Sequence, residues 1–378
     1  MKLSCPQETL SRGLQIVNRG VTTSSATTLP VLSNILFATD DGRLRLSATD
    51  LKVGVTVWIP AIVSEDGAVT LPARLVTEFV NSLPNEPVEL AAAGSQAVST
   101  LRCSRYSANI RGIDADEFPL IPTIADDVSA TVPAGLLRGM INQVVFAASS
   151  DATRGPLQGV FTTFSGDTLT LTASDAYRLS VRSAALSAPT AADFSVLIPA
   201  RTVAELGRIL PDDDSPVSIT VTPNRGQMLF HMENVDFLAT LLNEQFVPYK
   251  QIIPKEYRTR VVANTTDLQK AVKIASFFAR DGASMLKLNI ESSGDGNGTV
   301  TVSAETQDIG DNDSVVDAVV TGDALKIGFN SKYVADALNV MNSTQVALEL
   351  TSPTHAGVLR PVDGADFLHV IMPVSVPR

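Results

Sequence analysis

The sequence is poor in cysteine and has no long uninterrupted apolar segment. Only Cys5 and Cys103 occur among its 378 residues, and two cysteines make no disulfide framework, so we expect both thiols to be structural in a reducing compartment. No apolar run approaches the roughly 18 residues that a membrane-spanning helix needs. The opening MKLSCPQETLSRGL lacks the apolar core of a secretory signal. A cytoplasmic protein with no membrane partner is therefore expected.

Patterns typical of catalysis and metal binding are also missing. The sequence has no HExxH, CxxC, GxSxG, Walker or GxGxxG motif. His231, His355 and His369 stand alone in strand-like segments, where a histidine is most often structural. Asp50 and Asp175 could be a carboxylate pair, but turn stabilisation explains them better. We therefore predict no catalytic residue, no metal site and no cofactor.

Positive charge is scarce as well. The chain has 29 lysines and arginines against 40 acidic residues, a net charge of −11 and a pI near 4.8. Taken alone, this balance argues against binding to nucleic acid, because phosphate contacts need basic residues. A total says nothing about distribution, however, and an acidic exterior can coexist with a basic inner face.

What the sequence does contain is a repeated unit. At residues 71–84, LPARLVTEFVNSLP, a strand-like segment ends and an amphipathic helix begins, with Leu75, Phe79 and Leu83 expected on one buried face. The unit returns at intervals of about 130 residues, too long for a solenoid, as IPARTVAELGRIL at 198–210 and FNSKYVADALNVM at 329–341.

Two other features keep the same order and spacing. Short apolar helices are predicted at 10–17, 136–145 and 268–278, the first with Leu10, Gly13, Leu14 and Val17 as its apolar positions. Alternating strand-like segments follow at 43–60, 168–184 and 299–308. The sequence therefore predicts a triplicated α+β domain, each copy with two helices packed on antiparallel sheets. The expected domains are 1–125, 126–254 and 255–378.

A basic residue stands where the helix of each repeated unit begins. These residues are Arg74, Arg201 and Lys332. A cation at a helix N-terminus opposes the helix dipole, at a cost of roughly 0.3–1 kcal/mol. Two interpretations stay open: each side chain extends into solvent for no specific purpose, or it joins the helix amides in attracting phosphate without sequence preference.

At this point the chain resembles a known family, the bacterial DNA polymerase III beta subunit or sliding clamp. The resemblance covers all three repeats in family order. It is carried by TTLPVLSNILF (27–37), LSATDLKVGV (46–55), LPARLVTEFVNSLP (71–84), LTASDAYRLSV (171–181), IPARTVAELGRIL (198–210), IGFNSKYVADALN (327–339) and VIMPV (370–374).

The resemblance implies a ring. In that family two subunits join head to tail and enclose duplex DNA without sequence specificity, with helices lining the hole and sheets forming the outer wall. The implied partners are a second copy of the chain, the DNA polymerase III alpha subunit, other DNA polymerases, the clamp-loader ATPase and repair proteins with clamp-binding peptides. The DNA-facing candidates are Arg19, Arg74, Arg201 and Lys332.

The resemblance also implies a pocket for partner peptides between the second and third domains. Carried over by motif, its residues are Leu157, Ser174, Ala176, Tyr177, Arg178, Leu179, Val247, Gln251, Ile252, Asn330, Tyr333, Val370, Ile371, Met372 and Pro373. For Leu179, Val370 and Ile371, each taken alone, ordinary strand core is the better explanation, since alternation already accounts for an apolar strand residue. The chain departs from the family's usual pattern at Val247, Gln251 and Ala176, and it continues past the usual end with residues 375–378. These departures bear on peptide preference.

For ring closure, the matching positions are Tyr106, Phe277 and Phe278. Two adjacent phenylalanines on one helix would not both face a narrow core, so one is expected at an interface. The alternative is that a broad apolar face buries both.

Two other functions remain possible from the residues alone. One is an enzyme with an unrecognised site, which a cluster of polar groups with perturbed pKa values in a deep cleft would indicate. The other is a protein-interaction scaffold that does not bind DNA.

Overall fold

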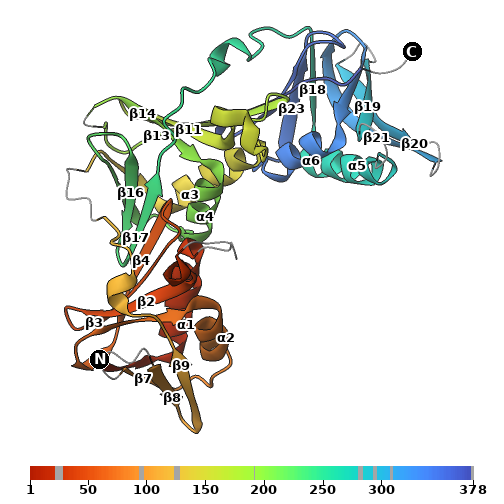
Figure 1. Ribbon diagram of the computed structural model, residues 1–378. Helices are drawn as coiled ribbons and strands as arrows, with labels where there is room; N and C mark the ends of the chain where they lie inside the picture. Colours follow the sequence, from red (N-terminus) through yellow and green to blue (C-terminus); the bar gives the residue numbers. More distant parts are fainter. Residues whose placement is uncertain are drawn as a thin grey trace. The chain divides into compact units, whose positions relative to one another are not determined.

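The computed structural model describes residues 1–21, 29–92, 98–122, 128–190, 192–279, 284–292, 296–306 and 310–375. These residues pack as two compact units (Figure 1). Unit 1 comprises Met1–Gly135 and Arg208–Leu241, and unit 2 comprises Leu136–Gly207 and Leu242–Arg378. The domain boundary expected at residue 125 lies outside the described residues.

Unit 1 contains two antiparallel sheets. The smaller has the order β5 (Ile62–Glu65), β1 (Lys2–Pro6), β7 (Pro87–Ala92), β8 (Val98–Cys103), β9 (Tyr106–Arg111). The larger has the order β10 (Ala130–Pro133), β15 (Pro216–Val221), β16 (Gln227–Met232), β17 (Val235–Thr240), β4 (Val53–Pro60), β3 (Arg43–Thr49), β2 (Asn34–Asp40), β6 (Ala68–Pro72). Helices α1 (Gln7–Val17) and α2 (Ala73–Asn81) lie side by side in this unit (Figure 1).

Unit 2 is built on one antiparallel sheet of twelve strands. Its order is β14 (Phe194–Pro199), β11 (Gly159–Ser165), β12 (Thr168–Ser174), β13 (Arg178–Ala185), β25 (Asp366–Ile371), β24 (Gly357–Pro361), β23 (Gln345–Leu350), β18 (Thr259–Asn264), β21 (Gly310–Gly322), β20 (Asn297–Thr306), β19 (Met285–Ser292), β22 (Leu325–Asn330). Its helices are α3 (Ala134–Val144), which begins at the end of unit 1, α4 (Ala200–Ile209), α5 (Thr265–Phe278) and α6 (Ser331–Asn339).

Short 3-10 helices connect these elements. They are η1 (Asn18–Gly20), η2 (Pro30–Ser33), η3 (Ala115–Glu117), η4 (Val145–Ala147), η5 (Ala152–Gln158) and η6 (Tyr249–Gln251). None of the helices in the described part of the chain is both long and apolar enough to cross a membrane.

The predicted helices are confirmed, but one buried face is wrong. Helix α1 buries Leu10, Gly13, Leu14 and Val17, the four apolar positions read from the sequence. Helix α2 instead buries Ala73, Val76 and Val80, and leaves Leu75 51% exposed. Apolar residues occupy two neighbouring stripes of this helix, both at a spacing of four, so periodicity alone does not decide which stripe faces the sheet.

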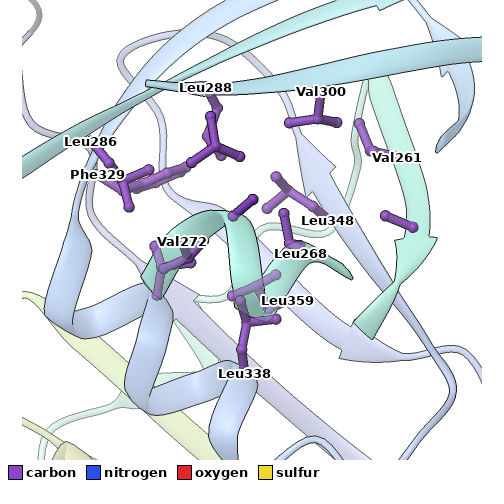
Figure 2. Packing of buried hydrophobic residues seen from close by; sticks show 14 of the residues in the cluster. Val261, Leu268, Val272, Leu286, Leu288, Val300, Phe329, Leu338, Leu348 and Leu359 are labelled. Atoms are coloured by element: carbon purple, nitrogen blue, oxygen red, sulfur yellow. The ribbon is translucent and has the colours of Figure 1, made fainter. Parts of the chain in front are cut away.

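The helices of unit 2 cover one face of its sheet. In Figure 2, Leu268 and Val272 of α5 lie among side chains from the strands, including Leu288 and Leu348. Leu338 of α6 completes the helix side of the same cluster. This alternation of apolar strand residues under an amphipathic helix is what the sequence pattern predicts.

Strand pairing joins elements that are distant in sequence, and it leaves two edges open. In unit 1, β17 pairs with β4, and in unit 2, β25 pairs with β13. By their position in the three repeats, β9, β17 and β25 are corresponding strands. Residues 310–317 of β21 correspond to β4 in the same way. Among the described residues, β9 pairs only with β8, and residues 310–317 pair only with β20. Each of these strands therefore has one unpaired side.

We expect Leu338→Ala to lower the free energy of unfolding of unit 2 by about 2–5 kcal/mol, because the side chain is fully buried and its loss leaves a cavity. Ile274→Ala is the matched control on the neighbouring helix α5, where the side chain is 43% exposed, and it should cost less than about 1 kcal/mol. Urea denaturation of both variants measures the difference. Equal losses would contradict the assignment of the core.

Candidate functional site

The same hydrogen-bonded turn occurs in the first two repeats. In the second repeat, the Asp175 carboxylate accepts from the amides of Tyr177 and Arg178 at 2.9 and 3.0 Å, and Ser174 Oγ donates to the Arg178 carbonyl at 2.7 Å. Asp50 accepts from the amides of residues 52 and 53 in the same way. The turn-stabilising interpretation of both aspartates is therefore confirmed.

This turn forms one wall of a cavity of about 170 Å³ in unit 2. The lining residues are Leu157, Ser174, Ala176, Tyr177, Arg178, Leu179, Val247, Ile252, Val370 and Met372. The floor is the pairing of β13 with β25, where Leu179 lies opposite Val370. Met372, in the segment that follows β25, forms another wall. A hydrogen bond from the Met372 amide to the Tyr177 carbonyl, at 2.9 Å, fixes this wall. A mostly apolar cavity with a few polar groups is typical of a site that binds an apolar anchor.

Arg178 supports this cavity from beneath. Its guanidinium group contacts Asp336 of α6 at 2.6 Å and Asp175 at 3.0 Å, and it donates to the Phe146 carbonyl at 2.8 Å. It also stacks on the Tyr333 ring, 4.4 Å from the ring centre. The Arg178 side chain is only 7% exposed, and a paired, multiply hydrogen-bonded cation is the form in which a buried charge is tolerated. Arg178 therefore holds the turn, α6 and η4 in one arrangement.

A buried histidine lies next to this network. His369 of β25 is fully buried and lies opposite Ser180 of β13 where these two strands pair. Its Nδ1 lies 2.6 Å from Ser180 Oγ. Burial, with a smaller contribution from the nearby Arg178 cation, lowers the pKa of His369 to about 3. The imidazole is therefore neutral at physiological pH and has a structural role, as the sequence predicts.

The remaining predicted pocket residues lie around this lining. Tyr333 contacts Arg178, and Asn330 caps α6 by accepting from the Lys332 amide at 3.0 Å. Ile371 belongs to the core cluster on the helix side of the sheet. Burial raises the pKa of the Tyr333 hydroxyl. Gln251 is exposed in η6 and Pro373 is half-buried. The structure therefore places ten of the residues in the cavity lining and the other five outside that lining.

Sequence reasoning missed Phe146 and Asp336, the partners of Arg178 from η4 and α6. The spacing of Tyr333 and Asp336 on one face of α6 was the available signal, but their common partner is 158 residues away in sequence from Asp336. His355 was also placed wrongly, since it lies in a turn and not in a strand. The turn residues around it, including Ser352, account for the difference.

The cavity lining offers little for catalysis. Tyr177 and Arg178 are its titratable side chains, and Arg178 is committed to two carboxylates. Across the residues that the structure describes, no group of three or more His, Cys, Asp or Glu side chains is arranged to hold a metal ion. The arrangement is suited to binding an apolar segment.

Comparisons with known proteins now decide the family. Models of the DNA polymerase III beta subunit match residues 1–122 (N-terminal domain), 131–248 (central domain) and 250–375 (C-terminal domain). The chain belongs to the DNA polymerase III beta subunit family. It is 31% identical to the beta sliding clamp of Synechococcus elongatus, over all of both chains, and 30% identical to that of Bacillus subtilis, over 99% of both. A crystal structure of the Bacillus subtilis sliding clamp superposes with a TM-score of 0.92 at 29% identity, covering all of both chains.

In this family member, the basic residues predicted to face DNA are exposed. Arg74, Arg201 and Lys332 are each the second residue of their helix, in α2, α4 and α6. Arg19 lies in η1. Arg74 donates to Glu78, one turn further along α2, at 2.8 Å, so its charge is partly offset. The positions at helix starts are confirmed, and contact with DNA stays a prediction.

The residues predicted for ring closure differ in exposure. Tyr106 at the start of β9 is 51% exposed, and Phe277 is 48% exposed. Phe278 instead packs, half-buried, against the core of unit 2. The alternative that both phenylalanines are buried is therefore wrong, and Phe277 is the better candidate for an interface.

We expect stability to depend on His369 below neutral pH. Its pKa is about 3 when folded and 6.5 in the unfolded reference, so the unfolded chain binds the proton first as pH falls. The stabilising contribution is complete above about pH 6.5 and is lost at about 1.4 kcal/mol per pH unit toward pH 3. Urea denaturation at pH 7.5 and pH 5 should show a smaller loss for His369→Gln than for the unchanged chain. Equal losses would contradict this role.

Proposed function

We propose that this chain is a DNA sliding clamp, a homodimeric ring that encloses duplex DNA and tethers a polymerase to it. The proposed domains are 1–125, 126–254 and 255–378, so that the ring contains six. The observation that carries the proposal is the pair of open strand edges, β9 in unit 1 and residues 310–317 of β21 in unit 2. Where the other repeats meet, the equivalent strands are paired.

The repeat also supports a register for the missing pairing. In unit 1, Val235 of β17 lies opposite Val57 of β4. By position in the repeats, Tyr106 corresponds to Val235, and Ser314 corresponds to Val57, because Val57 lies opposite Leu46 and Ser314 lies opposite Val302 at the same position of the preceding strand. The pairing of β25 with β13 leads to the same register. We therefore propose that Tyr106 of one copy lies opposite Ser314 of the other. A head-to-tail contact of this kind occurs twice in a dimer and closes the ring.

Charge supports the same pairing. The β8–β9 hairpin carries three exposed basic residues, Arg102, Arg105 and Arg111. The open part of β21 carries three exposed acidic residues, Asp311, Asp313 and Asp317. Opposite charges along two open edges favour pairing with each other and disfavour pairing of an edge with its own copy. The exposed side chains of Tyr106 and Phe277 are then available to an apolar centre for this interface.

The helix starts support weak contact with DNA. Helices α2, α4 and α6 have no acidic residue in the first turn and carry Arg74, Arg201 and Lys332 there. Helix amides and a nearby cation favour phosphate, without reading sequence. Few contacts and a net charge of −11 are compatible with sliding, because a closed ring retains DNA without tight binding.

We further propose that the cavity beside Arg178 binds short hydrophobic peptides of partner proteins. The partners proposed are the polymerase alpha subunit, other DNA polymerases, the clamp loader and repair proteins. The apolar lining and the positioned turn of Asp175 to Arg178 support this role. Such a clamp acts by holding its partners on DNA in the bacterial cytoplasm and is not itself an enzyme.

Reversal of the edge charges should split the dimer. Changing Arg102, Arg105 and Arg111 to Glu should weaken self-association by about a hundredfold or more, because like charges then face each other across the interface. Changing Asp311, Asp313 and Asp317 to Lys should do the same. The chain with all six changes is the matched control and should regain a mass of twice 40.0 kDa in sedimentation equilibrium. A dimer that persists when only the three arginines, or only the three aspartates, are changed would contradict the proposed pairing.

Ile252→Asp should weaken binding of a polymerase-derived clamp-binding peptide by about tenfold or more, because it places a charge in the apolar cavity. Ile252 is 45% exposed, so the variant should fold and still dimerise. Val362→Asp changes a similarly exposed aliphatic residue outside the lining and serves as the control. Fluorescence anisotropy with the labelled peptide measures both. Unchanged affinity in the Ile252 variant would refute the pocket assignment.

A further inference from the structure

Unit 1 has a second cavity, over the strand pairing that corresponds to the one at the floor of the cavity in unit 2. Its volume is about 200 Å³, and it lies over the pairing of β4 with β17. The segment 115–122 borders it, as residues 247 and 252 border the cavity of unit 2. In both units, therefore, the segment that connects two repeats lies over the paired strands where those repeats meet, and a cavity remains there.

The connecting segment is held at two points and leaves an apolar residue outside. Phe118 is buried, and Ile121 packs so closely on Gly54 of β4 that a side-chain carbon there would lie 2.9 Å from it. Leu120, between these two anchors, is 96% exposed although it lines the cavity. With Leu238 and Trp58 it supplies apolar walls that an entering side chain would contact.

One polar group in this cavity lacks a partner. Arg45 lines it, and among the described residues its Nε has no hydrogen-bond acceptor although it is buried. Its nearest carboxylate, Asp40, lies 3.8 Å from Nη1 and already accepts from the Trp58 indole at 2.7 Å. Asp236, the acidic residue of the lining, contacts His231 at 2.6 Å. The Arg45 side chain as a whole is 39% exposed, so a ligand carboxylate can approach its guanidinium group and bind it with two parallel hydrogen bonds.

We propose that this cavity is a second peptide-binding site. Its ligand is an extended segment of a partner protein in which an aromatic or large aliphatic residue is next to an aspartate or glutamate. The apolar side chain enters between Trp58 and Leu238, and the carboxylate binds Arg45. The repeat places Thr170 and Ser183 where unit 1 has Arg45 and Trp58, and neither of them lines the cavity of unit 2, so the two cavities select different peptides.

The chain contains a built-in reporter for this site, because Trp58 is its single tryptophan. The probe is the acetylated and amidated tetrapeptide Gly-Phe-Asp-Gly, titrated into the full-length protein while Trp58 fluorescence is recorded. We expect a saturable change, with affinity in the millimolar range for so small a ligand. The Gly-Phe-Asn-Gly peptide should bind about tenfold or more weakly, because it loses the charge-assisted hydrogen bonds.

Three variants locate the binding. Arg45→Gln should weaken the Asp peptide by about tenfold and abolish its preference over the Asn peptide. Arg12→Gln removes the same charge from helix α1 of the same unit, where the side chain is exposed and outside the lining, and should leave the preference intact. Leu120→Asp alters only an exposed wall and should also weaken binding.

The proposal is overturned by any of three results. These are no saturation up to about 10 mM peptide, equal affinity for the Asp and Asn peptides, or an equal loss in the Arg12 and Arg45 variants. Ile252→Asp, in the cavity of unit 2, should leave the fluorescence titration unchanged. Loss of the signal in that variant would assign the peptide to the other cavity and also overturn the proposal.

Discussion

Antiparallel pairing of strand edges is the constraint on which this structure depends. Each repeat ends its sheet with a strand whose amides and carbonyls need partners on both sides. Inside the chain, β17 meets β4 and β25 meets β13, so two such edges are satisfied by the preceding repeat. In the third set, β9 and the first part of β21 are each paired on one side only, and their other sides have no partner among the described residues. A second copy supplies the missing strands in the proposed ring, by the rule already used twice within the chain.

The same seams generate the binding surfaces. Where two repeats join, the chain must cross from one to the next, and the crossing segment lies over the paired strands. In unit 2 the seam is stabilised by Arg178 and by Ser180 with His369, and the hollow above it is mainly apolar. In unit 1 the equivalent hollow contains a partly unsatisfied arginine and a tryptophan. One architecture therefore offers two sites of different chemistry.

Sequence patterns predicted the local features of the fold well. The apolar positions of α1, the repeated turns at Asp50 and Asp175, and the antiparallel strands all depend on residues close in sequence. The buried face of α2 was wrong because two apolar stripes compete on a short helix, and tertiary packing selects between them. The exposure of Phe277 and the burial of Phe278 were likewise decided by packing.

The candidate sites were harder to predict for the same reason. Ten of the pocket residues carried over from the family line one cavity, but the contacts that position Arg178 come from Phe146 and Asp336, which no local pattern connects to it. The cavity at Arg45 gave no signal in sequence, since an arginine and a tryptophan in alternating strands are ordinary surface residues. This site becomes apparent only in the structure, where the unsatisfied Nε donor of Arg45 belongs to the cavity that the segment 115–122 borders.

The central claim is that the protein holds DNA by enclosing it. The most direct measurement loads the protein on a nicked circular plasmid with its clamp loader and ATP, removes free protein by gel filtration at high salt, and then cuts the plasmid once. The account predicts that the protein stays with the circle, and leaves within minutes after linearisation while the DNA mass is unchanged. Equal retention on circular and linear DNA, or none on either, would contradict it.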